Sequence, residues 1–141
     1  MEKIKFDSGV QEFRINGSGV LRFNPGDPNV FARFMESAQK MQELEKNLSQ
    51  EAKALDGADT QGMMALMQRT DKQIKELLGW VFGPMNDFEV ILGGVSLLAV
   101  ADNGQRVIAN LFDALRPVLE EGARRCAHQT AASIKGRRNT K

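Results

Sequence analysis

The sequence has few of the residues that catalytic, metal-binding and disulfide-linked proteins use. Its 141 residues include one cysteine (Cys126), one histidine (His128) and no tyrosine. A single cysteine excludes an internal disulfide and favours a reducing compartment. One cysteine and one histidine also fall short of the roughly four ligands of a standard zinc site. We therefore expect a fold held together by its apolar core, with no metal and no cofactor.

Catalytic motifs are equally scarce. Cys126 and His128 stand two positions apart, so on a helix they would point to different faces and would not form a nucleophile–base pair. Gly17-Ser18-Gly19 lacks the later glycine of a dinucleotide-binding loop, because Arg22 occupies that place, and it follows a predicted strand. No phosphate-binding glycine-lysine-serine/threonine run occurs. We expect no catalytic residues and a protein that is not an enzyme.

Long apolar runs are also missing. The most apolar stretch, VILGGVSLLAVA at 90–101, contains two glycines, and a transmembrane helix needs about 20 apolar residues. The segment MEKIKFDSG lacks the apolar centre of a signal peptide. A hydrophobic content of 42% and a charged content of 26% are ordinary for one globular domain. We expect a single domain over 1–141, soluble and cytoplasmic, without a membrane partner.

The charge is small in total but unevenly placed. The formal net charge is +1, yet residues 1–121 hold 13 basic and 18 acidic side chains, whereas residues 122–141 hold six basic and no acidic ones. Such an end is typical of a solvated tail, and we expect residues 134–141 to be flexible. A nucleic-acid-binding arm is the less favoured alternative for this basic tail.

The N-terminal part predicts a β-hairpin over 3–23 with two or three short strands. Residues 3–7, 11–15 and 20–23 alternate apolar with polar side chains. Asn16-Gly17 is a strong turn signal because both residues tolerate positive φ. The strands at 11–15 and 20–23 should therefore pair, while the pairing of residues 3–7 stays open. A hairpin this short needs a helix to pack against.

Two long helices should follow, at 27–56 and 60–82. Asp27 can cap the first, and Pro28 suits its first turn. A stripe of mainly apolar residues at spacings of three and four should form the buried face of each helix, and in the second helix it runs through Met63, Met67, Thr70, Ile74, Leu77 and Val81. Asp71 and Lys75 are expected on the wet face of the second helix. Gly57 and Gly83-Pro84 should end the two helices. The short loop at 56–59 predicts antiparallel neighbours.

The remaining chain predicts a short helix at 86–92 and a long one at 103–133. Asn86 resembles a capping residue for the first, and Asp102-Asn103-Gly104 should open the second. Pro117 lies inside the second pattern and should kink it near 113–117. Residues 95–101 fit either a buried helical turn or a strand. The fold class is therefore α+β, mainly α, with the hairpin packed on a bundle of three to four helices.

Candidate partner-binding residues come from the methionine and aromatic side chains of the second helix. Methionine repacks easily and suits surfaces that accept varied apolar partners. Met63 and Met64 are adjacent and cannot both face one core. Trp80 and Phe82 flank Val81 and would serve either as core or as an interface anchor. The candidate set is Met63, Met64, Met67, Trp80 and Phe82, and these helices offer a groove for an amphipathic partner helix.

Several quoted segments resemble a known family. After the hairpin come FNPGDPNVFARF, GWVFGPMNDFEVILGG and NLFDALRPVLEEG, in that order and within about residues 3–125. This arrangement is similar to the tail assembly chaperones, small proteins encoded among the tail genes of long-tailed phages and prophages. The most specific part is FGPMNDFEVILGG followed by VIANLFDALRPVLEE.

The resemblance implies a function without catalysis. Tail assembly chaperones act in the cytoplasm of the infected cell on the long tape-measure protein, which sets tail length. They keep its apolar helical stretches soluble until tail-tube protein polymerises around it. Members are mostly helical, can form homo-oligomers, are typically absent from the finished particle, and often have a longer form made by ribosomal frameshift. A structural tail or adaptor component of the virion is the alternative.

Overall fold

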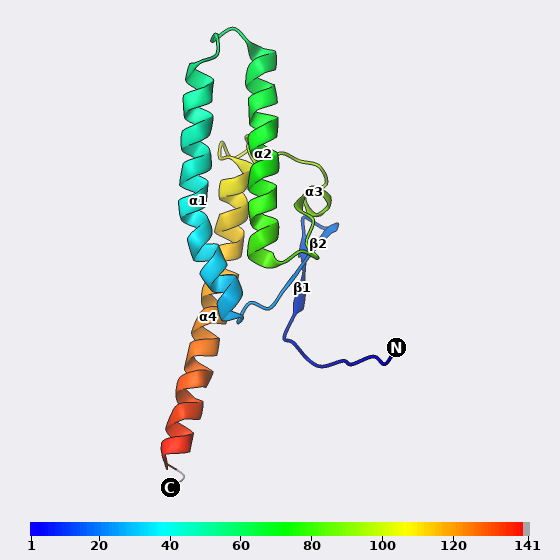
Figure 1. The fold of residues 1–141 in the computed structure, drawn as a ribbon, viewed down its shortest axis with the longest axis vertical. Coiled ribbons are helices and arrows are strands. Elements are labelled where there is room, and N and C mark those ends of the chain that lie inside the picture. The colour runs from blue at the N-terminus through cyan, green and yellow to red at the C-terminus, as the bar shows by residue number, and fades with distance from the viewer. Residues whose placement is uncertain (140–141) are drawn as a thin grey trace.

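A computed structural model describes the backbone of residues 1–139 and the side chains of residues 1–136 (Figure 1). The elements are β1 (Gln11–Ile15), β2 (Gly19–Phe23), α1 (Pro28–Lys53), α2 (Thr60–Phe82), α3 (Phe88–Ile91) and α4 (Val107–Asn139). The predicted class, α+β and mainly α, is confirmed. The molecule is elongated, with the α1–α2 loop at one end and the C-terminal half of α4 at the other.

The hairpin forms where the sequence predicts it. β1 and β2 pair antiparallel, with Phe13 opposite Leu21. Asn16 and Gly17 both adopt positive φ, 49° and 85°, and the Ser18 N–H donates to the Ile15 carbonyl at 3.3 Å. Asparagine and glycine tolerate this left-handed turn, which is why the sequence signal is strong here.

The possible third strand at 3–7 does not form, and within the described residues the sheet has two strands. Ile4 and Phe6 are 86% and 81% exposed. Asp7 accepts the Gly9 N–H at 2.8 Å, and Asn24 Nδ2 donates to the Ser8 carbonyl at 3.1 Å. These two contacts turn the chain at Gly9, and the segment before it leads away from β1 as an arm without regular structure (Figure 1).

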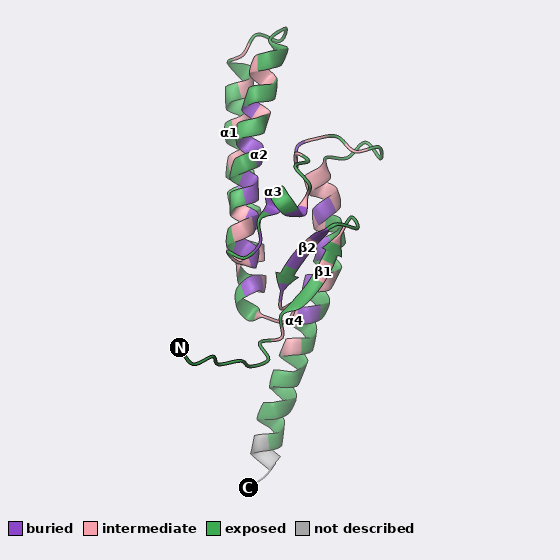
Figure 2. Cartoon of the chain, turned by 90° about the vertical axis from the view of Figure 1, so that its right-hand side faces the viewer, coloured by how far each residue is buried: buried purple, intermediate pink, exposed green. Residues whose placement is uncertain are grey.

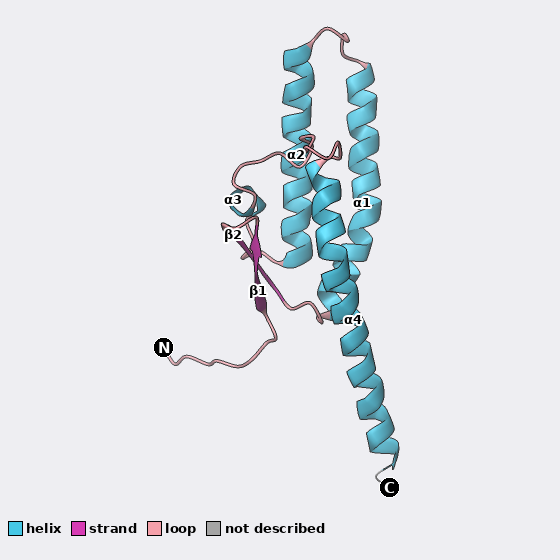
Figure 3. Ribbon diagram, turned by 180° about the vertical axis from the view of Figure 1, so that it is seen from behind, coloured by secondary structure: helices cyan, strands magenta, loops and turns pink. Residues whose placement is uncertain are grey.

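The two long helices are antiparallel neighbours, as predicted, and lie side by side over most of their length (Figures 1 and 3). Asp27 caps α1 by accepting the Asn29 N–H at 2.9 Å, and Pro28 takes its first position. Asp59 caps α2 through the Gly62 N–H at 2.8 Å. The bounds of α2 match the prediction, whereas α1 ends at Lys53, before the predicted residue 56 and before Gly57.

The short helix is capped by Asp87, which accepts the Glu89 N–H at 3.0 Å, and Asn86 has another role. The Asn86 amide accepts the Arg22 N–H at 2.8 Å and donates to the Arg22 carbonyl at 2.8 Å and the Phe82 carbonyl at 3.0 Å. The predicted cap at Asn86 is therefore wrong. Its side chain joins the free edge of β2 to the end of α2.

The last helix begins later and ends later than predicted. Asp102-Asn103-Gly104 forms a turn, and the Val107 and Ile108 N–H groups donate to the carbonyls of Ala99 and Leu97, both at 2.9 Å. Residues 95–101 form turns with a single bridge from Val100 to Arg106, neither a helical turn nor a strand. The helix passes through Pro117, and the kink expected at 113–117 stays a prediction.

Residues 134–139, which belong to the predicted flexible tail 134–141, continue α4 as helix, and residues 140 and 141 lie outside the described chain. The flexibility of this segment stays a prediction. The prediction required an apolar core-facing stripe to sustain the helix. Lys135, Arg137 and Arg138 in this segment have high helix propensity even without such a stripe.

The core lies where the hairpin and all four helices meet (Figure 2). Phe23 stacks on Phe13 and contacts Phe82 edge-on, both with ring centroids 4.9 Å apart. Fully buried aliphatic residues complete the core, among them Leu21, Leu78, Val81, Leu97 and Leu119. At Gly19 a Cβ would lie 2.0 Å from the Ile91 carbonyl oxygen, so glycine is needed for α3 to approach. The hairpin thus covers the end of the helical core.

Candidate functional site

A groove runs between the exposed side of α2 and the loop that follows α3. It has a volume of about 480 Å³. Met64, Met67 and Lys72 line it from α2, and Leu98, Val100 and Arg106 line it from the other side. We call it the α2 groove. Met64 and Val100 are exposed large apolar side chains, so the groove presents adaptable apolar surface to solvent.

The structure brings together only part of the predicted partner-binding set. Met64 and Met67 line the α2 groove, while Met63 is half-buried and does not line it. Trp80 is partly exposed at the other end of α2, where Lys40 Nζ lies 4.1 Å from its ring centroid, a cation–π contact.

Phe82 is only 4% exposed and packs between Phe23 and Phe88. It belongs to the core and is withdrawn from the candidate surface.

The buried face of α2 is rotated relative to the predicted one. Leu66 and Leu78 are buried, whereas Met63, Met67 and Leu77 are half-buried. On a helix this rich in apolar residues, two overlapping sets of positions both follow the spacing of three and four, and either could form the buried face. The structure selects the set that leaves methionine at the groove.

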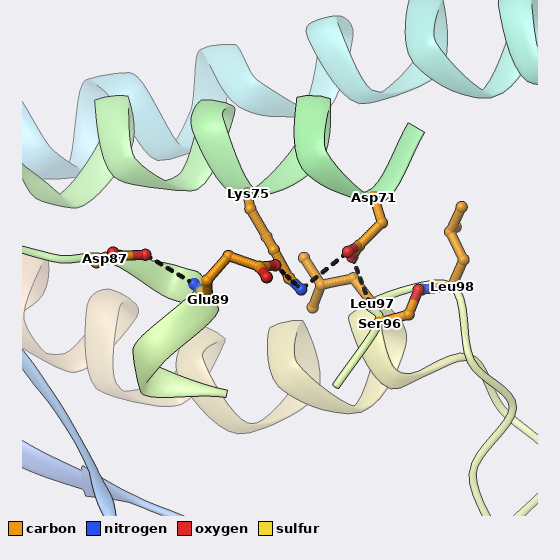
Figure 4. Close-up of polar contacts among 7 residues, drawn as sticks. All are labelled: Asp71, Lys75, Asp87, Glu89, Ser96, Leu97 and Leu98. Atoms are coloured by element: carbon orange, nitrogen blue, oxygen red, sulfur yellow. Dashed lines mark hydrogen bonds and ion pairs between the residues drawn. The ribbon is translucent and has the colours of Figure 1, made fainter. Parts of the chain in front are cut away.

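Beneath the groove lies a buried ionic network that the sequence analysis placed on the wet face. Asp71 and Lys75 are 5% and 6% exposed. Lys75 Nζ contacts Asp71 Oδ2 at 2.8 Å and also contacts Glu89 Oε1, and Asp71 Oδ1 accepts the Leu97 N–H at 2.7 Å (Figure 4). The expectation of a wet face is wrong because α3 and the loop at 95–98 cover this side of α2.

The charges of the network hold Lys75 in its protonated form. Burial on its own would lower the pKa of Lys75, but the hydrogen bonds and charges of Asp71 and Glu89 outweigh it and raise that pKa above its ordinary value of 10.5. Asp71 is therefore compensated by a fixed cation. This arrangement ties the far wall of the groove, residues 95–98, to α2.

Sequence analysis did not identify the groove residues that come from the loop. Leu98 and Val100 belong to the apolar stretch at 90–101, which showed no clear periodicity. Arg106 Nη1 donates to the Leu98 carbonyl at 2.5 Å and holds this wall in place. The available signal was a run of apolar residues in a segment whose pattern fits a buried helical turn and a strand equally well.

No protein family, curated protein or solved structure matches this chain. Among the described helices, none combines the length and the apolarity needed to cross a bilayer. No group of three or more histidine, cysteine, aspartate or glutamate side chains within the described residues is arranged to hold a metal ion. The groove geometry and the sequence resemblance are therefore the two grounds for a functional proposal.

Proposed function

We propose that this chain is a non-catalytic protein that binds apolar helical segments of a partner in the α2 groove and keeps them soluble. The observation that carries the proposal is the exposed Met64 and Val100 pair across a groove lined also by Met67 and Leu98. An amphipathic helix fits such a groove through anchors at helical spacing. Flexible methionine side chains accept anchors of different shape.

Taken with the resemblance, the proposal becomes specific. We propose a tail assembly chaperone of a long-tailed phage, acting in the host cytoplasm on the tape-measure protein. Weak binding at one groove suffices, since many copies along one long filament cover its apolar stripes collectively. Tail-tube protein then displaces the copies by competition, without a bound nucleotide.

The test is co-expression with an apolar helical fragment of a tape-measure protein, followed by measurement of its soluble fraction. The wild-type chain should keep the fragment soluble. Met64→Lys places a charge in the groove and should lower the soluble fraction severalfold. Met35→Lys is the matched control, because Met35 is 58% exposed on α1 and Met64 is 59% exposed.

Two results would contradict the proposal. The fragment precipitates to the same extent with and without the chain, or Met64→Lys and Met35→Lys behave alike. Mass spectrometry of purified phage particles tests the rival structural role, because a virion component would be present there in stoichiometric amount.

A further inference from the structure

A second apolar groove lies far from the α2 groove, at the other end of the molecule. The C-terminal half of α4 projects past the remaining elements (Figures 1 and 3). Between it and the start of α1 is a cavity of about 590 Å³. Phe31 and Ile134 line this α1–α4 groove together with Ala123, Ala127 and Ala131. Ile134 is an exposed large apolar side chain.

The groove is shaped for a helix. Ala123, Ala127 and Ala131 recur every four residues and lie on one face of α4. Small side chains at such positions allow the axis of a second helix to come close. Phe31 provides a larger apolar wall from α1, and Ile134 continues the alanine face toward the C-terminal end of α4.

The α4 side of the groove is net basic, because residues 122–141 hold six basic and no acidic side chains, whereas Asp27 lies on the α1 side, between the lining residues Gly26 and Pro28. Arg124 and Lys135 are both exposed and lie together on a neighbouring face, about 70° around the helix from the alanine face at 100° per residue. The last acidic residue of the sequence is Glu121, which contacts Arg124. An apolar face bordered on its α4 side by basic residues complements a partner helix that is apolar on one side and acidic on the flank that faces α4.

The other partners of a basic helix fit less well. A helix that lies on a membrane surface carries several large apolar residues such as leucine or tryptophan, and here Ile134 is the one such residue on the projecting face. Nucleic acid is held through phosphate contacts and gains nothing from an apolar groove. The N-terminal arm of a second copy carries two acidic and two basic residues in 1–8, so it offers no charge attraction.

We propose that the α1–α4 groove binds an acidic amphipathic helix of another protein. Its apolar side would enter between Phe31 and Ile134, and its glutamate or aspartate side chains would face Arg124 and Lys135. This surface is separate from the α2 groove, and the inference does not depend on the identity of the partner that binds there.

The test uses the full chain and a fluorescein-labelled synthetic helical peptide with leucine on one face and glutamate on the flanks. Binding is followed by fluorescence anisotropy at near-physiological salt. Ala127→Gln fills the groove and Lys135→Glu reverses a flanking charge, and each should weaken binding by about tenfold, equivalent to about 1.4 kcal/mol. Both residues are exposed, and circular dichroism checks that the variants fold.

Matched controls separate this site from general attraction. Ala132→Gln adds the same side chain on another exposed face of α4, and Lys46→Glu makes the same charge change on α1. Neither should change the affinity. A peptide with lysine in place of glutamate, and one with the same composition but no apolar face, should bind at least tenfold more weakly.

Three outcomes would overturn the proposal. The first is no binding of the acidic peptide, or equal loss in groove and control variants. The second is binding of duplex DNA or of anionic lipid vesicles that Lys135→Glu removes while the peptide does not bind. The third is a dimer that Ala127→Gln dissociates, again without peptide binding. Met64→Lys should leave peptide affinity unchanged, so failure here and failure of the chaperone proposal are distinguishable.

Discussion

At the scale of single residues, the buried Asp71–Lys75 pair determines how the α2 groove is built. Two charges taken out of water stabilise a fold only when both are paired and hydrogen-bonded. Asp71 meets this condition through Lys75 and the Leu97 N–H, and Lys75 through Asp71 and Glu89. Loss of one partner therefore leaves a buried charge without compensation.

Lys75→Met should destabilise the protein by about 3–5 kcal/mol, because Asp71 stays buried without its cation. Adding Asp71→Asn should restore part of this loss, since the asparagine oxygen still accepts the Leu97 N–H while the buried charge is removed. Lys72→Met changes a lysine of α2 that is exposed, and it should change the free energy of unfolding by no more than about 0.5 kcal/mol. Urea unfolding measures all three, and equal effects of the two single lysine variants would contradict a buried network.

The same pair gives a dependence on pH. Because the pKa of Lys75 is raised in the folded state, its contribution to the free energy of unfolding is fully present below pH 10.5. This contribution falls as the pH rises through the raised pKa. The free energy of unfolding, measured between neutral and alkaline pH, should show this decrease in the wild type and in Lys72→Met. It should be missing in Lys75→Met.

At the scale of elements, the hairpin is attached to the helices by one polar side chain, Asn86, and by aromatic packing. Asn86 supplies three hydrogen bonds that link β2 to the end of α2. The aromatic contacts of Phe23 with Phe13 and Phe82 add apolar packing on the same element. A two-stranded hairpin is marginal alone, so both kinds of contact are needed to keep it in place.

Asn86→Ala should destabilise the protein by about 1–3 kcal/mol, because the Arg22 and Phe82 backbone groups lose their buried partner. Asn47→Ala, at an exposed position of α1, is the control and should be nearly neutral. Hydrogen exchange gives a local measurement: the Arg22 amide should lose protection in Asn86→Ala. Unchanged protection there would show that the hairpin is held without this bridge.

Elements with local signals were predictable from the sequence, and those that depend on distant contacts were not. The Asn16-Gly17 turn, the Asp27-Pro28 helix start and the bounds of α2 follow from nearby residues alone. Asn86 and Asp102-Asn103-Gly104 also fit local capping patterns, but β2 and the loop carbonyls of Leu97 and Ala99 supply the contacts that decide their roles. The Asp71–Lys75 spacing of four is common on exposed helices, and no local feature marks it as buried.

At the scale of the whole molecule, the two apolar grooves lie in separate parts of an elongated fold. Of the candidate residues, Met64 and Met67 were identified from sequence because methionine is itself the signal. Leu98 and Val100 were not, since their segment has no periodicity. The basic end is predicted to be a tail because its residues lack a core-facing stripe. The groove that Ile134 lines also needs the start of α1, a contact that no local sequence feature indicates.

The N-terminal arm bears on the same whole-molecule question, because Ile4 and Phe6 are apolar residues outside the folded body. Deleting residues 1–7 should change the free energy of unfolding by no more than about 0.5 kcal/mol, since exposed side chains contribute little. Deleting residues 1–15 also removes β1 and the ring of Phe13 stacked on Phe23, and should cause cooperative loss of stability. Urea unfolding compares the two truncations. A loss above about 1 kcal/mol in the shorter deletion would mean that the arm packs against the fold in solution, since burying two large apolar side chains stabilises by more than that.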